Sequence, residues 1–208
     1  MLGFDDVWLA TRHLHSGLTP AEARVLYDLS AGVHASTSGS VVEIGAYTGK
    51  STTLLSASGP IWSIDHHRGN SEHQPGQPRC RPGTLVDGRV DTYPELMRTL
   101  RGVGLAESVN VLVTDHLSAL SIFPPDALPI ALLFVDAEHS YEGNASIITQ
   151  WCSRVTGTML FHDYSDEFPG MIRSVDEARP LFGPEVVRVD SLIGFAVGSP
   201  SRGEASRG

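Results

Sequence analysis

The sequence has little of several residue types that would place the chain in other structural classes. It contains two cysteines, Cys80 in a polar segment and Cys152 in a helical pattern, so we expect two free thiols and no disulfide framework. No apolar run approaches the ~20 residues that a membrane-spanning helix requires. Lysine is almost missing, since Lys50 is the only one, and we attribute this to codon bias in a GC-rich genome.

Positive charge is scarce as well. The chain has 15 lysine and arginine residues against 24 aspartate and glutamate residues, which gives a formal net charge of -9. This balance disfavours a broad surface for nucleic acid or for an anionic membrane. The start, MLGFDDVWLATRH, also lacks the basic-then-apolar order of a secretory signal. We therefore expect a cytoplasmic protein whose partner is a small molecule, and the sequence leaves open whether the chain forms a homo-oligomer.

Short apolar runs alternate with amphipathic segments through most of the chain, which is typical of an α/β protein with a parallel sheet. The last two runs are too close together for a parallel crossover, so they should form an antiparallel hairpin. The sequence thus predicts a Rossmann-like, doubly wound, mostly parallel seven-stranded sheet with a terminal antiparallel hairpin. The predicted strands are residues 41–44, 61–64, 109–114, 130–135, 158–161, 186–189 and 193–197.

The pattern also divides the chain into segments. Residues 1–39 are predicted to be helical and to pack on the core, and residues 40–198 are predicted to form the main domain. Within that domain the segment 66–91 is polar and rich in Gly, Pro and Arg, and its length favours a functional lid over a simple connector. Residues 199–208 are expected to be a disordered tail.

The start of one N-terminal helix is marked by its capping residues. Thr19 has the character of an N-cap, Pro20 suits the first helical position, and Glu22 closes a capping box. We expect this helix to continue to about Val33.

The segment EIGAYTG, residues 43–49, follows an apolar run and leads into a helix. Glycine lets the backbone turn sharply and approach a ligand, and the amides at a helix start favour polar or anionic groups. Only Gly45 and Gly49 are present, so the spacing is not the dinucleotide-binding G-x-G-x-x-G pattern. A plain strand-to-helix turn is the alternative interpretation of this loop.

Two aspartates at strand ends support a ligand site. Asp65 closes the next apolar run, the place from which an acid accepts hydrogen bonds from ribose hydroxyls in this architecture. Asp115 follows a later strand, where it is equally well explained as a contact to the adenine edge or as the N-cap of the next helix. The loop and Asp65 together favour an adenosyl cofactor.

A second pair of aspartates, Asp136 and Asp163, closes two consecutive strands that would lie side by side. Ligands of such folds bind outside the carboxyl ends of the strands, and two carboxylates there can share a hard cation such as Mg²⁺. The alternative is that both acids only form local hydrogen bonds. His139 lies three residues after Asp136, and an imidazole there suits a general base at neutral pH. His162 should point away by alternation and serve in packing or in supporting the site.

Four lid residues resemble a metal cluster in composition only. His66, His67, Glu72 and His73 lack thiolate partners and a regular ligand spacing. We expect them to be solvated.

The loop and its acids resemble the class I S-adenosylmethionine-dependent methyltransferases, whose first motif reads E-x-G-x-x-x-G with an acid closing the next strand. The resemblance covers roughly residues 40–198. It implies that Glu43, Gly45 and Gly49 hold the methionine part of the cofactor, and Ala46 of the same loop is also predicted to bind the cofactor. By the same resemblance, Asp65 would hold the ribose and Asp115 the adenine region.

More narrowly, VDAEHSYEG and FHDYSDEFPG resemble the small-molecule O-methyltransferases that include macrolide-sugar methyltransferases. In metal-dependent relatives the acids matching Asp136 and Asp163 bind the ion, with a neighbouring Asp or Asn as third ligand. Here that position is Tyr164, a poor Mg²⁺ ligand. The resemblance also implies that His139, in the D-x-x-H motif, accepts the hydroxyl proton.

The sequence therefore predicts an O-methyltransferase for a hydroxyl of a sugar, polyketide or phenolic natural product, with S-adenosylmethionine as donor, Mg²⁺ at Asp136 and Asp163, and a catalytic role for Asp136 and His139. Two rivals stand beside it. The D-x-x-H and HDY phrases also resemble a cephalosporin-hydroxylase-like branch, which would add oxygen. The other rival is a cofactor-binding module without turnover.

Overall fold

The computed structural model describes residues 1–36 and 38–198, so the predicted tail 199–208 lies outside the described residues. Its α-helices are α1 (Phe4–Thr11), α2 (Pro20–Ser36), α3 (Lys50–Ser56), α4 (Tyr93–Gly102), α5 (His116–Ile122), α6 (Tyr141–Trp151) and α7 (Pro169–Glu177). Its strands are β1 (Ser40–Ile44), β2 (Ile61–Asp65), β3 (Leu85–Val86), β4 (Arg89–Val90), β5 (Val109–Val113), β6 (Ile130–Val135), β7 (Val155–Phe161), β8 (Glu185–Val189) and β9 (Leu192–Ala196).

Seven strands form one sheet in the order β5-β2-β1-β6-β7-β9-β8. The five strands from β5 to β7 are parallel, and β9 runs antiparallel to both β7 and β8. The predicted α/β fold with its terminal antiparallel hairpin is thus confirmed. The chain builds outward from β1 to β2 and β5, then returns to β6 on the other side of β1. This reversal places the topological switch point between β1 and β6, where open α/β sheets bind ligands.

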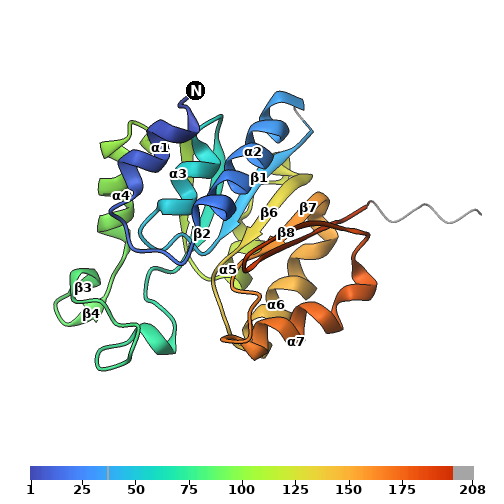
Figure 1. Ribbon diagram of the computed structural model, residues 1–208. Coiled ribbons are helices and arrows are strands. Elements are labelled where there is room, and N and C mark those ends of the chain that lie inside the picture. Colours follow the sequence, from blue (N-terminus) through green and yellow to red (C-terminus); the bar gives the residue numbers. More distant parts are fainter. Residues whose placement is uncertain (37, 199–208) are drawn as a thin grey trace, which may run out of the picture.

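Helices cover both faces of the sheet, with α1 to α4 on one side and α5 to α7 on the other (Figure 1). The central strand β6 is buried along its whole length, which explains its continuous apolar sequence. Its alternate side chains enter different cores: Leu132 and Phe134 pack with the layer of α1 to α4, while Leu133 and Val135 pack with the layer of α5 to α7.

The N-terminal helices join the core through charged as well as apolar residues. Lys50 at the start of α3 is nearly buried, with its Nζ 4.5 Å from the ring centre of Trp8 in α1. Burial lowers the pKa of this lysine. Along the described ranges, no helix is both long and apolar enough to cross a membrane.

The capping box at the start of α2 forms as the sequence predicts. The amide of Thr19 donates to Glu22 at 2.8 Å, and the amide of Glu22 donates to the Thr19 hydroxyl at 3.2 Å. The helix continues to Ser36, beyond the expected end near Val33. The fully buried Glu22 carboxylate also accepts hydrogen bonds from the amide and hydroxyl of Ser191, both at 2.8 Å. Glu22 thus ties α2 to the turn between β8 and β9.

The segment 66–91 contains more structure than a polar loop. It holds the short antiparallel pair β3 and β4 and two 3-10 turns, Ser71–His73 and Pro82–Thr84. His67 was expected to be solvated, but it is buried and its Nδ1 lies 2.7 Å from the Thr92 hydroxyl. That expectation is wrong because His67 directly follows β2 and packs beside Tyr93 at the start of α4.

The Glu22 contacts predict a large effect of mutation. Replacing Glu22 by Ala removes a buried carboxylate and leaves its partners without an acceptor, so we expect Glu22→Ala to lower the free energy of unfolding by about 3–5 kcal/mol. Asp28→Ala in the same helix breaks only the exposed pair with Arg24 and should cost less than about 1 kcal/mol. Urea unfolding of the two variants measures both values, and equal losses would contradict the assignment.

Candidate active site

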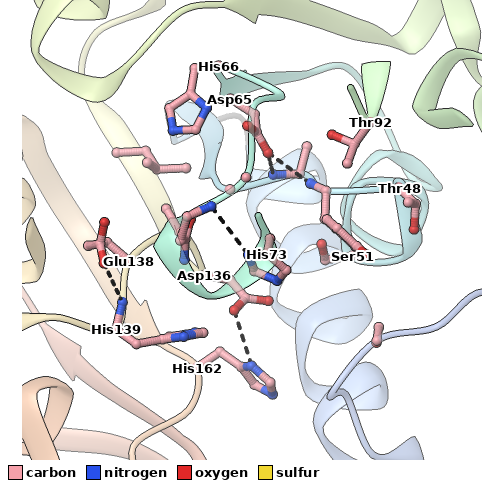
Figure 2. Close-up of a pocket in the computed structure, with 18 of the residues that line it drawn as sticks. Thr48, Ser51, Asp65, His66, His73, Thr92, Asp136, Glu138, His139 and His162 are labelled. Atoms are coloured by element: carbon pink, nitrogen blue, oxygen red, sulfur yellow. Dashed lines mark hydrogen bonds and ion pairs between the residues drawn. The ribbon is translucent and has the colours of Figure 1, made fainter. Parts of the chain in front are cut away.

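A cavity of about 360 Å³ opens at the carboxyl ends of the parallel strands. Figure 2 shows Asp65 on one side of it and Asp136, His139 and His162 on another. The structure brings most of the predicted site residues to this cavity and leaves Glu43 and Gly49 out of its lining. Those that line it are Gly45, Ala46, Asp65, Asp115, Asp136, His139 and Asp163.

The glycine loop allows two close approaches. At Gly45, whose φ is +100°, an added Cβ would lie 2.2 Å from the backbone oxygen of Asp136. At Gly49, whose φ is +96°, it would lie 2.7 Å from Leu96 of α4. Only glycine both adopts the left-handed backbone conformation easily and fits where there is no room for a Cβ atom. Gly45 therefore lets the ends of β1 and β6 meet at the switch point, while Gly49 lets α3 pack on α4.

Glu43 lies beneath the loop and not in the cavity. Its fully buried carboxylate accepts hydrogen bonds from the hydroxyls of Ser51 at 2.5 Å, Thr52 at 2.7 Å and Ser63 at 2.9 Å. Burial outweighs these bonds and raises the pKa of Glu43 to about 7. This geometry gives Glu43 a supporting role, in which it fixes the start of α3 against β1 and β2.

Asp65 and Asp115 both line the cavity from strand ends. The Asp65 carboxylate accepts hydrogen bonds from the amides of Ala46 and Tyr47, each at 2.9 Å (Figure 2). It also accepts a hydrogen bond from the amide of His67 at 2.6 Å. Asp115 caps α5, because its carboxylate accepts from the amides of residues 117 and 118 at 2.9 Å. The capping interpretation of Asp115 is thus observed, and a contact to an adenine stays a prediction.

Asp136 and Asp163 meet at a buried histidine. Nδ1 of His162 lies 3.3 Å from Asp136 and 3.4 Å from Asp163, and its Nε2 lies 3.4 Å from Glu22. Burial alone would lower the pKa of His162, but Asp136, Asp163 and Glu22 raise it to about 12. His162 is therefore a buried cation that contacts both aspartates from the protein interior.

The backbone at Asp163 explains why His162 does not follow strand alternation. Strand β7 ends at Phe161, and Asp163 has a left-handed φ of 58°. This turn brings the side chains of both residues to the same cluster. Burial would raise the pKa of Asp163, but hydrogen bonds from His139 and His162 hold it well below its usual range.

Both ring nitrogens of His139 contact carboxylates. Nδ1 lies 2.7 Å from Oε1 of Glu72, and Nε2 lies 3.0 Å from Oδ2 of Asp163. The ring also packs on Phe168, with the ring centres 4.1 Å apart. Burial lowers the pKa of His139, but the hydrogen bond to Asp163 and the charges of Asp136 and Glu72 raise it overall. His139 is held in one orientation, with Nε2 toward the two aspartates.

The cluster has the chemistry of a cation site. One donor atom each from Asp136, His139 and Asp163 lie within 4.8 Å of one another, which is close enough for a single ion. Tyr164 takes no part, because its hydroxyl donates to Asp176 at 2.8 Å. The buried imidazolium of His162 faces three carboxylates, those of Asp136, Asp163 and Glu22. Negative charge therefore exceeds positive charge among these four groups.

Several residues near the cavity were not predicted from the sequence to belong to the site. They come from segment 66–91 and from the loop between α1 and α2. Glu72 reaches His139, which contradicts its expected solvation, because the 3-10 turn at 71–73 folds over the cavity. His66 does remain exposed, and His73 lies half-buried with its ring centre 5.6 Å from that of Tyr47. Residues 15–18 also line the cavity, although no motif in that loop marks them.

The buried Glu43 predicts a pH dependence of stability. Its folded pKa of about 7 lies above the value near 4.3 of an unfolded glutamate. Its contribution to stability is thus fully present below about pH 4.3 and is lost as the pH rises through 7. Relative to Glu43→Gln, the wild-type free energy of unfolding should fall by ~4 kcal/mol over that interval. Urea titrations at pH 4 to 8 measure it, and a constant difference would refute the shift.

Comparisons with known proteins agree with this geometry. Residues 42–164 match a family model described as a methyltransferase domain. The O-methyltransferase NovP shares 17% sequence identity with this chain, with a TM-score of 0.67 over 89% of this chain and 83% of NovP. Cofactor-bound Rv0187 from MTB shares 17% identity, with a TM-score of 0.65 over 93% of this chain and 88% of that protein.

A third similar structure is the O-methyltransferase TomG from Streptomyces achromogenes, in complex with SAM, with 13% identity and a TM-score of 0.62 over 94% of this chain and 89% of TomG. Identities this low establish a shared fold. The family model, by contrast, covers more than half of the chain. The chain therefore belongs to this methyltransferase family, and its resemblance to the class I S-adenosylmethionine-dependent methyltransferases is confirmed.

Proposed function

We propose that this protein transfers a methyl group from S-adenosylmethionine to a hydroxyl of a small molecule. One observation carries the proposal: a single cavity joins the glycine loop and Asp65 to the cluster of Asp136, His139 and Asp163. The loop and Asp65 are suited to binding the methyl donor, and the cluster is suited to binding the acceptor hydroxyl or a cation that holds it. Methyl transfer requires the donor and the acceptor to lie in the same cavity.

The loop and the strand ends fit an adenosyl donor. Gly45 lines the cavity at the switch point, and the Asp65 carboxylate can accept hydrogen bonds from a ribose. Asp115 lies at the end of β5, the position suited to the adenine. When bound, S-adenosylmethionine supplies an electrophilic methyl group on a positively charged sulfur.

The cluster fits a divalent cation such as Mg²⁺, with Asp136 and Asp163 as its protein ligands. Both provide the oxygen donors that a hard cation prefers, and His162 holds both carboxylates in place. Such an ion supplies charge that favours the deprotonated form of an acceptor hydroxyl.

His139 would act as the base. In this structure its Nε2 contacts Asp163 at 3.0 Å. With a cation bound to that carboxylate, Nε2 would be free to receive the hydroxyl proton as the acceptor oxygen attacks the methyl carbon. The new bond is O–C and the broken bond is C–S, with the electron pair leaving on sulfur. Alignment of the two substrates supplies much of the acceleration.

Natural products such as sugars, polyketides or phenols are the acceptor classes that we favour. TomG, which shares the fold, is involved in tomaymycin synthesis. The lid at 66–91 lies over the cluster, and we assign it the choice among acceptors. A hydroxylase would give a product that gains one oxygen, whereas methyl transfer adds one CH₂ unit, so mass spectrometry of the product separates the two.

Cofactor binding predicts a thermal shift. S-adenosylmethionine or S-adenosylhomocysteine at about 100 times its Kd should stabilise the native state by about 2.7 kcal/mol. Asp65→Ala should abolish the shift, whereas Asp126→Ala on an exposed turn should keep it. Differential scanning fluorimetry measures the effect. A thermal shift with NAD and none with S-adenosylmethionine or S-adenosylhomocysteine would contradict the proposed cofactor.

The cation proposal predicts a reversible loss of turnover. EDTA should stop methyl transfer and added Mg²⁺ should restore it. Asp163→Asn should lower turnover at least 10-fold, because asparagine tolerates the left-handed backbone but lacks the charge. Isothermal titration with Mg²⁺ should show weaker binding to that variant. Full activity in metal-free buffer would rule the cation out.

A further inference from the structure

The lid carries one carboxylate that contacts the proposed base directly. Glu72 Oε1 lies 2.7 Å from His139 Nδ1, and the two side chains are 28% and 15% exposed. The other oxygen of Glu72 lies 3.5 Å from Nε of Arg79. Both carboxylate oxygens of Glu72 are therefore engaged, one of them by the histidine.

Arg79 fixes this carboxylate from the lid side. Its backbone amide donates to the carbonyl of Glu72 at 3.2 Å, and its guanidinium lies 4.7 Å from the ring centre of Phe168. It also pairs with Glu167. Phe168 also packs against His139, so Arg79 of segment 66–91 and the proposed base contact the same aromatic ring.

The two nitrogens of an imidazole have different duties in a base. The nitrogen that receives a proton must face the acceptor, and a partner on the other nitrogen fixes the tautomer and the ring orientation. In this structure Nδ1 lies 2.7 Å from Glu72 and Nε2 lies 3.0 Å from Asp163. If Asp163 binds the proposed cation, Nε2 is the nitrogen left for the acceptor. Only the lid supplies the Nδ1 partner among the described residues.

We propose that Glu72 is a positioning residue for His139, which accepts the Nδ1 hydrogen and leaves Nε2 directed to the acceptor. The inference rests on the proposed function and adds to it a dependence on the lid. Because Glu72 belongs to segment 66–91, Nδ1 of the base is held only while this segment lies over the cavity, whereas Asp163 and Phe168 contact the ring independently of it. Closure of the segment over an acceptor would therefore complete the orientation of the base.

Turnover of Glu72 variants tests this role. Glu72→Ala should lower kcat by about 10- to 100-fold, the loss typical of removing a histidine's outer carboxylate partner, while KM for S-adenosylmethionine changes less than about 2-fold. Glu167→Gln is the matched control, because Glu167 binds the same Arg79 but has no contact with His139 among the described residues. It should keep kcat within about 2-fold, and an equal loss in both variants would mean that Glu72 only latches the lid.

A double-mutant cycle separates positioning from a general structural effect. In the His139→Ala background, Glu72→Ala should cause no further loss of kcat, since the residue acts through the missing histidine. A loss as large as in the wild type would overturn the proposal. A melting temperature of Glu72→Ala within about 2 °C of that of Glu167→Gln, the range for a surface substitution, shows that folding is intact.

A spectroscopic readout does not depend on methyl transfer. In protein with ¹⁵N-labelled histidine, the signals missing from His139→Ala identify this residue. Its Nδ1–H proton should be visible and shifted downfield in the wild type and in Glu167→Gln, and lost in Glu72→Ala. An unchanged Nδ1–H signal in Glu72→Ala would refute the contact. If that signal behaves as expected but no acceptor is methylated, the proposed function fails and the contact stands.

Discussion

The site depends on one buried positive charge, the imidazolium of His162. Three carboxylates from different parts of the fold meet at this ring: Glu22 from α2, Asp136 from the end of β6 and Asp163 from the turn after β7. Without the ring, Asp136 and Asp163 would lie together in a partly buried place with less positive charge to offset their repulsion. The same ring therefore holds the two aspartates and fastens an N-terminal helix to the end of the sheet.

The site combines residues from regular and irregular parts of the fold. The sheet fixes the strand ends, the glycine at residue 45 lets β1 and β6 approach, and the buried histidine sets the distance between the two aspartates. The lid and the loop at 15–18 then complete the walls of the cavity. Strand ends thus carry Asp65 and Asp136, and segments with irregular structure form part of the cavity wall.

The strand-end residues could be predicted from the sequence because the sheet topology alone determines where they lie. Asp65, Asp136 and Asp163 each end an apolar run, and parallel strands bring such ends to one edge. The contacts of Glu72 could not be predicted, because they depend on the path of a long irregular segment. His162 was misplaced by simple alternation, since the left-handed turn at Asp163 begins directly after it. Glu22 was recognised as a cap, but its bond to Ser191 joins residues far apart in the sequence.

The burial of Lys50 has a practical consequence for chemical modification. It is the only lysine of the chain, and its ammonium group lies against Trp8 at the base of the cavity loop. Amine-directed labels and cross-linkers therefore find no exposed lysine side chain on this chain. A lysine introduced at an exposed position far from the cavity would be a selective attachment point for a fluorophore or a surface, and would leave the cavity open to its ligands.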